Sequence, residues 1–394
     1  MFYAPAVAVR GSSQRILVVG GGPAGSVAAT LLARGGRDVT LVEAARFPRD
    51  KVCGECLSDL GWQVLKRHGL DAPLTELRPV PLRTAVLCAR GGGRAELDLP
   101  HPMHGVTRRV MDVALLDAAR NSGVTVVQPG RVEAMTGTRA TLRIDGERQD
   151  IDFDLVVLAD GKGTLPGAAP RRPPTPSGDL GVKAHFEAGP GDAETIGLYG
   201  LRGHYVGTAP ASDGDRRVLN VAMSVPAAKV RRFASDFDAL LVACCEENPA
   251  FGCLIGGRER VTKWHASPLP RFAPRRPQDW PPGVIPVGNA AAALEPVGGE
   301  GMGLAIASAE LAAAAILRGE VPETLAAAYR RLWRTRRAAC RAAAVALSTP
   351  FAGGAVVTLA RLLPLARTVG LHLIGKRGEA SFPASGISAA TTTR

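Results

Sequence analysis

The chain has 394 residues, of which 46% are hydrophobic and 21% charged, and its formal net charge is +12. These proportions are those of a folded globular protein and exclude a mostly disordered chain. The positive charge comes mainly from arginines scattered along the sequence, which argues against a nucleic-acid interface and leaves open peripheral binding to an anionic membrane. The length suits two intertwined domains or one large α/β domain with a cap.

The seven cysteines are odd in number and irregularly spaced, and the first thirteen residues lack the pattern of a secretory signal. Both features favour a cytoplasmic location over a secreted disulfide framework. Only Cys53 and Cys56 have the spacing of metal ligands, and one such pair is too few for a structural zinc site, so we expect no metal.

The N-terminal region predicts one βαβ unit. Arg15–Val19 is continuously apolar and reads as a buried parallel strand, Pro23–Arg34 is rich in alanine and leucine and reads as a helix, and Asp38–Val42 reads as the next strand. The helix is stopped by two glycines at 35 and 36.

Further along, apolar runs predict buried strands at 125–127, 155–158 and 284–287 and helices at 106–121, 235–247 and 303–318. Short runs over 181–225, separated by Gly, Asp and Pro, predict an antiparallel sheet. The pattern is helical from residue 323 onward. The longest uncharged stretch, 342–360, contains Pro350, Gly353 and Gly354, so we predict two buried helices joined at 348–354 and place a membrane span second.

The segment between the first strand and helix has the sequence Gly20-Gly-Gly22-Pro-Ala-Gly25, which satisfies G-x-G-x-x-G. In this context Gly20 permits a tight turn, Gly22 lets the backbone approach a pyrophosphate, and Gly25 lets the helix pack against the strand. Glu43, at the end of the next strand, suits the hydroxyls of an adenosine ribose and would repel a 2′-phosphate. The unit therefore predicts a site for FAD or NAD.

Two later segments indicate that the site binds FAD rather than NAD. Residues 154–164 (DLVVLADGKGT) resemble the Asp-Gly motif of flavoprotein hydroxylases and geranylgeranyl-reductase-like proteins, and residues 287–303 resemble their Gly-Asp motif and the helix start beneath the flavin ring. Arg108, four residues before Asp112, resembles the arginine of a helix in the same group. The chain thus resembles the superfamily of para-hydroxybenzoate-hydroxylase-like monooxygenases and geranylgeranyl-reductase-like proteins, and is closer to the second branch.

The resemblance implies an α/β fold in which a Rossmann-like FAD domain is interleaved with a mainly antiparallel β-sheet substrate domain and followed by C-terminal helices. The expected FAD domain comprises 15–80, 106–170 and 271–325, the substrate-side sheet 81–105 and 171–270, and the helical region 326–384, with tails at 1–14 and 385–394. The expected FAD-binding residues are Gly20, Gly22, Pro23, Ala24, Gly25, Glu43, Ala44, Arg108, Asp160, Gly161, Gly288, Asn289, Pro296, Gly299, Gly301 and Met302. Asn289 departs from the pattern, because the group has aspartate there.

Candidate residues near the flavin and substrate are Cys53, Glu55 and Cys56, in a segment similar to the flavin-facing loop of the reductase-like branch. A C-x-x-C pair also suggests a redox dithiol, but no second G-x-G-x-x-G is present for a nicotinamide domain, so we favour a cavity-lining role. Tyr205 and Gly207 stand where flavin-dependent halogenases have the two tryptophans of Trp-x-Trp-x-Ile-Pro, which argues against halogenation. His185, His204 and His265 are scattered and read as structural.

These features favour an FAD-dependent oxidoreductase of secondary metabolism, first a monooxygenase that hydroxylates an apolar aromatic or polyketide-like small molecule. A C=C reductase of an isoprenoid or lipid is the alternative, and a flavin disulfide reductase or a non-catalytic flavin-binding protein ranks below both. NADH or NADPH is the expected transient electron donor.

Overall fold

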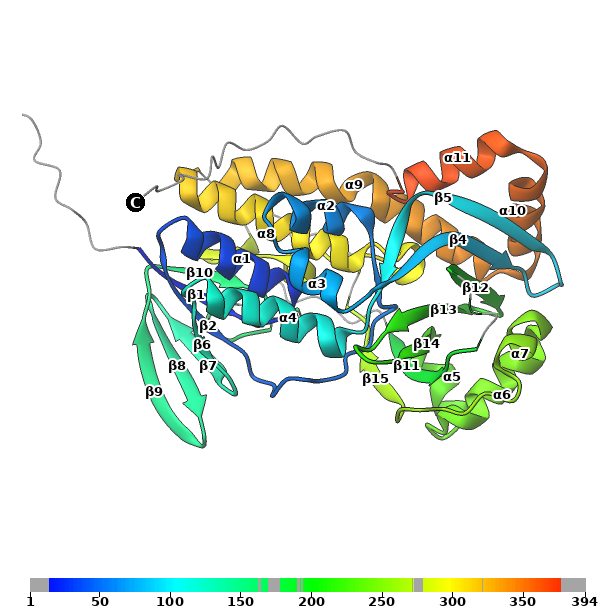
Figure 1. Ribbon diagram of the computed structural model, residues 1–394, viewed down its shortest axis with the longest axis horizontal. Helices are drawn as coiled ribbons and strands as arrows, with labels where there is room; N and C mark the ends of the chain where they lie inside the picture. Colours follow the sequence, from blue (N-terminus) through cyan, green and yellow to red (C-terminus); the bar gives the residue numbers. More distant parts are fainter. Residues whose placement is uncertain are drawn as a thin grey trace, which may run out of the picture.

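The structure, a computed structural model, describes residues 14–161, 164–168, 178–189, 192, 194–270, 272, 279–320 and 322–376. Residues 1–13 of the first expected tail and all of the second, 385–394, lie outside these residues. Figure 1 shows two β-sheet regions side by side, with long helices lying across both of them.

The first region is built on a five-stranded sheet in the order β16-β10-β1-β2-β6, and all of its pairs are parallel. Its strands are β1 (Arg15–Val19), β2 (Asp38–Val42), β6 (Thr125–Val127), β10 (Leu155–Leu158) and β16 (Val284–Pro286). The sequence predicted these strands to within one residue, because each is a short apolar run, and all except the edge strand β6 are mostly buried.

Alternation of side chains along β1 explains how this sheet is covered. Ile16 and Val18 face helices α1 (Pro23–Arg34), α4 (Arg108–Asn121) and α8 (Gly301–Arg318). Leu17 and Val19 point to the opposite face and pack against a small three-stranded sheet of β7 (Arg131–Thr136), β8 (Arg139–Ile144) and β9 (Glu147–Asp152). The sequence did not predict this small sheet, since its strands are half polar and only one of their faces is buried.

The second region is an eight-stranded sheet in the order β15-β11-β14-β13-β12-β4-β5-β3. The central strands β11 (Asp179–Glu187), β12 (Thr195–Leu201), β13 (His204–Ser212) and β14 (Arg217–Pro226) form the predicted antiparallel sheet. The other strands are β3 (Cys56–Leu57), β4 (Val80–Cys88), β5 (Arg94–Gly105) and β15 (His265–Pro268). β4 pairs with β12 in parallel.

Helices cover both faces of this sheet. On one face lie α5 (Ala227–Arg232), α6 (Phe237–Glu247) and α7 (Pro249–Ile255). On the other lie α9 (Pro322–Leu347), α10 (Pro350–Leu362) and α11 (Pro364–Leu373), with α10 packed against β5. Two short helices, α2 (Asp59–Arg67) and α3 (Ala72–Glu76), follow β3, and α2 packs on α8.

One expectation for the C-terminal region needs correction. α9 (Pro322–Leu347) is the helix that the pattern from residue 323 predicts. The stretch 342–360 does form parts of two helices, but α10 is not buried: Phe351 is 92% exposed, and only Gly353, Val357 and Ala360 of α10 are fully covered. The stretch has the uncharged composition of a core segment, although Phe351, Val356 and Leu359 are exposed.

Candidate functional site

The glycine loop joins β1 to α1 with the geometry that its sequence predicts. Gly20 has φ of 106°, and a Cβ atom on Gly25 would lie 1.8 Å from the Gly20 carbonyl oxygen, so only glycine lets the helix approach the strand this closely. A Cβ atom on Gly22, in contrast, would meet only the Arg108 Nη2 atom, at 3.5 Å. The chain itself does not require glycine at 22, which fits a position kept open for a ligand.

Glu43 and Arg108 lie at the two sides of this loop. The Glu43 carboxylate accepts hydrogen bonds from the backbone N–H of Gly21 (2.7 Å) and Ala45 (2.8 Å). Arg108, at the start of α4, forms a bidentate ion pair with Asp112, with two N–O distances of 2.7 Å. This pairing fixes the guanidinium beside Gly22, and Arg49 adds a second cation 3.3 Å from Asp112.

The Asp-Gly motif at 160–161 and the motif at 288–289 both lie beside the glycine loop. Asp160 and Gly161 follow β10, where Gly161 has φ of 76°. Gly288 begins the 3-10 turn η2 (Gly288–Ala290), and a Cβ atom there would lie 3.2 Å from the side chain of Ala24 in the glycine loop. Its backbone N–H donates to Ser308 of α8 at 2.8 Å. The Asn289 side chain is exposed.

Pro296 starts a second 3-10 turn, η3 (Pro296–Gly298), which leads through Gly299 (φ 64°) into α8 at Gly301 and Met302. A Cβ atom on Gly299 would lie 3.6 Å from the Cys56 Cβ atom. The turn therefore touches the Cys53–Cys56 segment. Glu300, fully buried at the helix start, forms an ion pair of 2.6 Å with Lys376.

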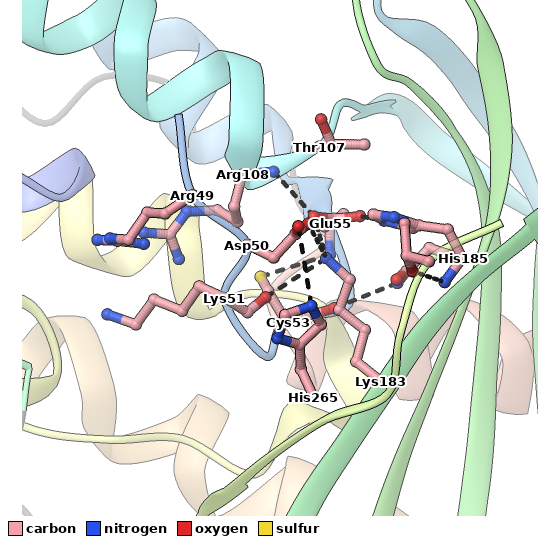
Figure 2. A network of polar contacts seen from close by, with 12 residues as sticks. Arg49, Asp50, Lys51, Cys53, Glu55, Thr107, Arg108, Lys183, His185 and His265 are labelled. Atoms are coloured by element: carbon pink, nitrogen blue, oxygen red, sulfur yellow. Dashed lines mark hydrogen bonds and ion pairs between the residues drawn. The ribbon is translucent and has the colours of Figure 1, made fainter. Parts of the chain in front are cut away.

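The segment that carries Cys53 and Cys56 is held by a buried polar network around Glu55 (Figure 2). The Glu55 carboxylate accepts from Lys183 Nζ at 2.6 Å and from the backbone N–H of Arg108 at 2.8 Å, and lies 2.6 Å from His185 Nε2. Asn220 of β14 donates to the Cys53 carbonyl at 3.2 Å. Glu55, Lys183 and His185 are each at most 1% exposed.

This network explains an unusual backbone conformation. Glu55 has φ of 58°, in the left-handed region that non-glycine residues rarely adopt, and the three contacts of its side chain hold it there. The Glu55 side chain therefore points toward β11 and the start of α4. Arg49 and Lys51 point away from Glu55 in Figure 2. Sequence reasoning treated His185 as structural and did not select Lys183, because buried lysines have no signature in a single sequence.

Neither cysteine of the pair is in a disulfide. Burial raises the pKa of the Cys56 thiol to about 12, so this thiol is protonated at neutral pH. Because the thiolate is the nucleophile in disulfide exchange, Cys56 is not suited to be the attacking thiol.

An apolar cavity of about 420 Å³ lies between the eight-stranded sheet and helices α9, α10 and α11. Four of the five candidate residues line it, together with the turn at Pro296–Gly299: these are Cys53, Cys56, Tyr205 and Gly207. Glu55 does not. The Tyr205 hydroxyl donates to Glu295 at 3.4 Å, and Glu295 also pairs with Arg341 at 2.9 Å. Tyr205 thus gives the mostly apolar cavity a hydrogen-bonded polar corner, and Thr208, Ser224, Arg367 and Lys376 also line it.

Comparison with known proteins agrees with this geometry. The sequence profile of the FAD binding domain family matches residues 13–169, which contain the glycine loop, Glu43, Arg108 and Asp160. This segment is an FAD-binding domain. The cofactor is FAD, and the relatives of the chain include a squalene monooxygenase, a tryptophan 2-halogenase and a geranylgeranyl diphosphate reductase.

Among FAD-dependent relatives, the menaquinone reductase of Mycolicibacterium smegmatis is 36% identical over 129 residues, which are 31% of this chain and 30% of that protein. Among solved structures, the flavin-dependent brominase Bmp2 has a TM-score of 0.76 at 17% identity and 96% coverage of both chains. A geranylgeranyl bacteriochlorophyll reductase-like protein from Thermoplasma acidophilum has a TM-score of 0.70 at 18% identity, covering 95% of this chain and 98% of that one. These two structural likenesses concern the fold.

The residues present fit FAD. The open side of Gly22, with the Arg108 guanidinium and the N-terminus of α1 beside it, suits a pyrophosphate. Glu43 keeps acceptor capacity for ribose hydroxyls besides its two backbone contacts. The start of α8, after Pro296 and Gly299, provides backbone N–H groups where the flavin ring would meet the cavity.

Proposed function

We propose that this protein is an FAD-dependent monooxygenase that hydroxylates an apolar molecule carrying one polar, phenol-like group. The observation that carries the proposal is the cavity, whose mostly apolar walls join the turn at Pro296–Gly299 to the polar corner at Tyr205, which is hydrogen-bonded to Glu295. Apolar walls would bind the body of the substrate, and the corner would orient its polar group.

The polar corner favours a hydroxyl ligand. Burial, followed by the neighbouring carboxylate, raises the pKa of Tyr205 well above its ordinary value, so the phenol keeps its proton. Burial also raises the pKa of Glu295 and outweighs the opposing effects of Arg341 and Tyr205. Tyr205 would accept a hydrogen bond from a substrate hydroxyl while donating its own to Glu295, which fixes the reacting carbon relative to the turn at Pro296.

The redox chemistry would come from bound FAD. In balance, one oxygen atom of O₂ enters a substrate C–H bond, the other leaves as water, and NADH or NADPH supplies the two electrons. The cavity walls would exclude bulk water from this reaction. Seven cysteines without disulfides suit a reducing compartment, so we propose a cytoplasmic location. We also propose that the protein makes peripheral contact with a membrane.

A C=C reductase is the second candidate, because one relative, 36% identical over 129 residues, is a menaquinone reductase, and an apolar cavity also suits an isoprenoid chain. The two electrons and two protons would then add across a double bond, with no oxygen consumed. The matched region spans less than a third of that relative, so its substrate is a proposal for this chain.

The test is turnover of menaquinone and of long-chain phenols by the FAD-loaded protein, with and without oxygen. Products that gain one oxygen atom and form only with oxygen support the monooxygenase. Products that gain two hydrogen atoms and form without oxygen contradict it and support the reductase. Gly207→Trp should fill the cavity and abolish turnover with the flavin spectrum unchanged. Gly207→Ala is its control, because a Cβ atom there would have its nearest neighbour at 3.7 Å, an ordinary contact.

A further inference from the structure

Helices α10 and α11 form a hairpin at the outer end of the molecule, beyond the eight-stranded sheet (Figure 1). Ten large hydrophobic side chains are exposed among the described residues, and eight of them lie between Phe351 and Leu373; the other two are Val242 and Val345. Phe351, Leu362 and Leu365 are 92%, 70% and 75% exposed. Such a concentration on two short helices marks an interaction surface rather than ordinary scatter.

The charge of the hairpin indicates what this surface binds. Residues 348–376 contain no aspartate or glutamate, and Arg361 is exposed next to Leu362. Arg367 is partly buried, and Lys376 is paired with the buried Glu300. An apolar helix face with an exposed arginine and no acidic residue is the pattern of a segment that lies in the interface of an anionic membrane.

The hairpin has the geometry of a surface segment rather than of a span. α10 has 13 residues and α11 has 10, and each is shorter than the roughly 20 residues that cross a bilayer. α9 and α10 together have the length and composition of a span, but they are bent by 113° at residues 348–349. The hairpin would therefore lie along the surface of the membrane.

The cavity continues to the same surface. Val356, Leu359 and Leu373 line the cavity and are 38%, 49% and 41% exposed, so they belong to both the wall and the outer face. The far wall is formed by Cys53, Cys56 and the turn at Pro296–Gly299. One apolar space thus connects the expected flavin position with the exposed hairpin.

We propose that the outer face of the α10–α11 hairpin docks on an anionic phospholipid membrane, with its apolar side chains among the upper acyl chains and Arg361 at the headgroups. The mouth of the cavity then opens toward the acyl chains. This last point rests on the proposed function, since it makes the membrane the source of the apolar substrate. The docking itself does not depend on turnover.

The experiment is flotation of the FAD-loaded protein with vesicles of equal parts phosphatidylglycerol and phosphatidylcholine, compared with vesicles of phosphatidylcholine alone. The protein should float with the anionic vesicles, and added salt should weaken this binding. Hydrogen exchange over residues 350–373 should slow when the anionic vesicles are added.

Leu362→Gln with Leu365→Gln should weaken the partition at least about ten-fold, since two exposed leucines lose their burial in lipid; neither residue lines the cavity. Arg361→Gln should weaken it about five-fold on anionic vesicles only. The matched control is Val242→Gln on α6, which is 57% exposed in wild type and should leave the partition unchanged.

Three results would overturn the proposal: no flotation with either vesicle, an equal effect of Val242→Gln, or a dimer in solution that the Leu362 and Leu365 changes dissociate without any vesicle binding. The last would make a second copy of the chain the occupant of this face. Gly207→Trp, which tests the proposed function, should float as wild type does. Loss of turnover and loss of docking are therefore separable.

Discussion

Lys183 Nζ lies 2.6 Å from Glu55 Oε1, and both side chains are fully buried. Glu55→Gln removes the negative charge but leaves the lysine in place. An uncompensated buried charge costs about 3 to 5 kcal/mol. Asp50, 3.8 Å from Lys183 Nζ, compensates part of the charge, so we expect a loss of about 3 kcal/mol in the free energy of unfolding, measured by denaturant titration. The Cys53–Cys56 segment should also lose its fixed position, and turnover should fall with it.

A charge-pair control separates this effect from a general effect of removing a carboxylate. Glu194 pairs with Arg83 at 2.7 Å on the surface, where the two side chains are 46% and 62% exposed. Glu194→Gln should cost less than about 1 kcal/mol. Glu55→Gln combined with Lys183→Met should recover part of the stability, and a double variant as unstable as the sum of the two single variants would contradict the coupling.

The same pair predicts how stability depends on pH. Burial alone would raise the pKa of Glu55, but the charge of Lys183 and the hydrogen bond to His185 outweigh it and hold this pKa below its ordinary value. A depressed carboxyl pKa contributes stability that is complete above the ordinary value of about 4.3 and disappears as the pH falls through the folded value. The difference in melting temperature between wild type and Glu55→Gln should be constant from about pH 7 to 5 and shrink below about pH 4.

Gly22→Val should abolish FAD binding while leaving the fold intact. The side chain would occupy the open space beside the Arg108 guanidinium, which we assign to the pyrophosphate. Absorbance of the purified protein measures retained flavin, and circular dichroism reports the fold. Gly91→Val is the matched control, because a Cβ atom at Gly91 meets nothing within 4 Å. A normal flavin spectrum in Gly22→Val would remove this loop from the cofactor site.

Asn289→Asp should preserve or tighten FAD binding. The side chain is exposed on η2, so a carboxylate there loses little hydration, and it would accept a charge-assisted hydrogen bond from a ribityl hydroxyl. Fluorescence titration of the apoprotein with FAD measures the change, with Asn289→Ala as the comparison that should bind more weakly. Markedly weaker binding in Asn289→Asp would mean that the pocket is adapted to asparagine.

Cys56→Ser should keep the flavin spectrum and much of the activity, because a protonated thiol with a pKa of about 12 serves as a small wall residue. Cys53→Ser should change rate or product distribution more, since Cys53 begins the segment that touches the flavin-facing turn. Steady-state rates of the two FAD-loaded variants measure this. Complete loss of turnover in both would favour disulfide exchange instead.

Apolar runs and glycines in the sequence were sufficient to predict the βαβ unit. β1, α1 and β2 have the bounds that apolar runs and glycines predict, because each depends on neighbours in sequence. The network of Glu55, Lys183 and His185 was not predictable in this way, since its members lie 128 and 130 residues apart. α10 was mispredicted as buried, because hydropathy records which residues are apolar and not which of them lack a covering element.

The parallel sheet has a consequence for how the protein is made. β10, at residues 155–158, pairs on one side with β1 and on the other with β16 at residues 284–286. A nascent chain that ends near residue 169, where the FAD-binding sequence match stops, therefore presents β10 as an open edge of Val and Leu. Unpaired edges of this kind associate with other chains. Synthesis must thus continue through more than a hundred further residues before this edge is closed, and a fragment cut at the limit of the cofactor motif should aggregate rather than fold.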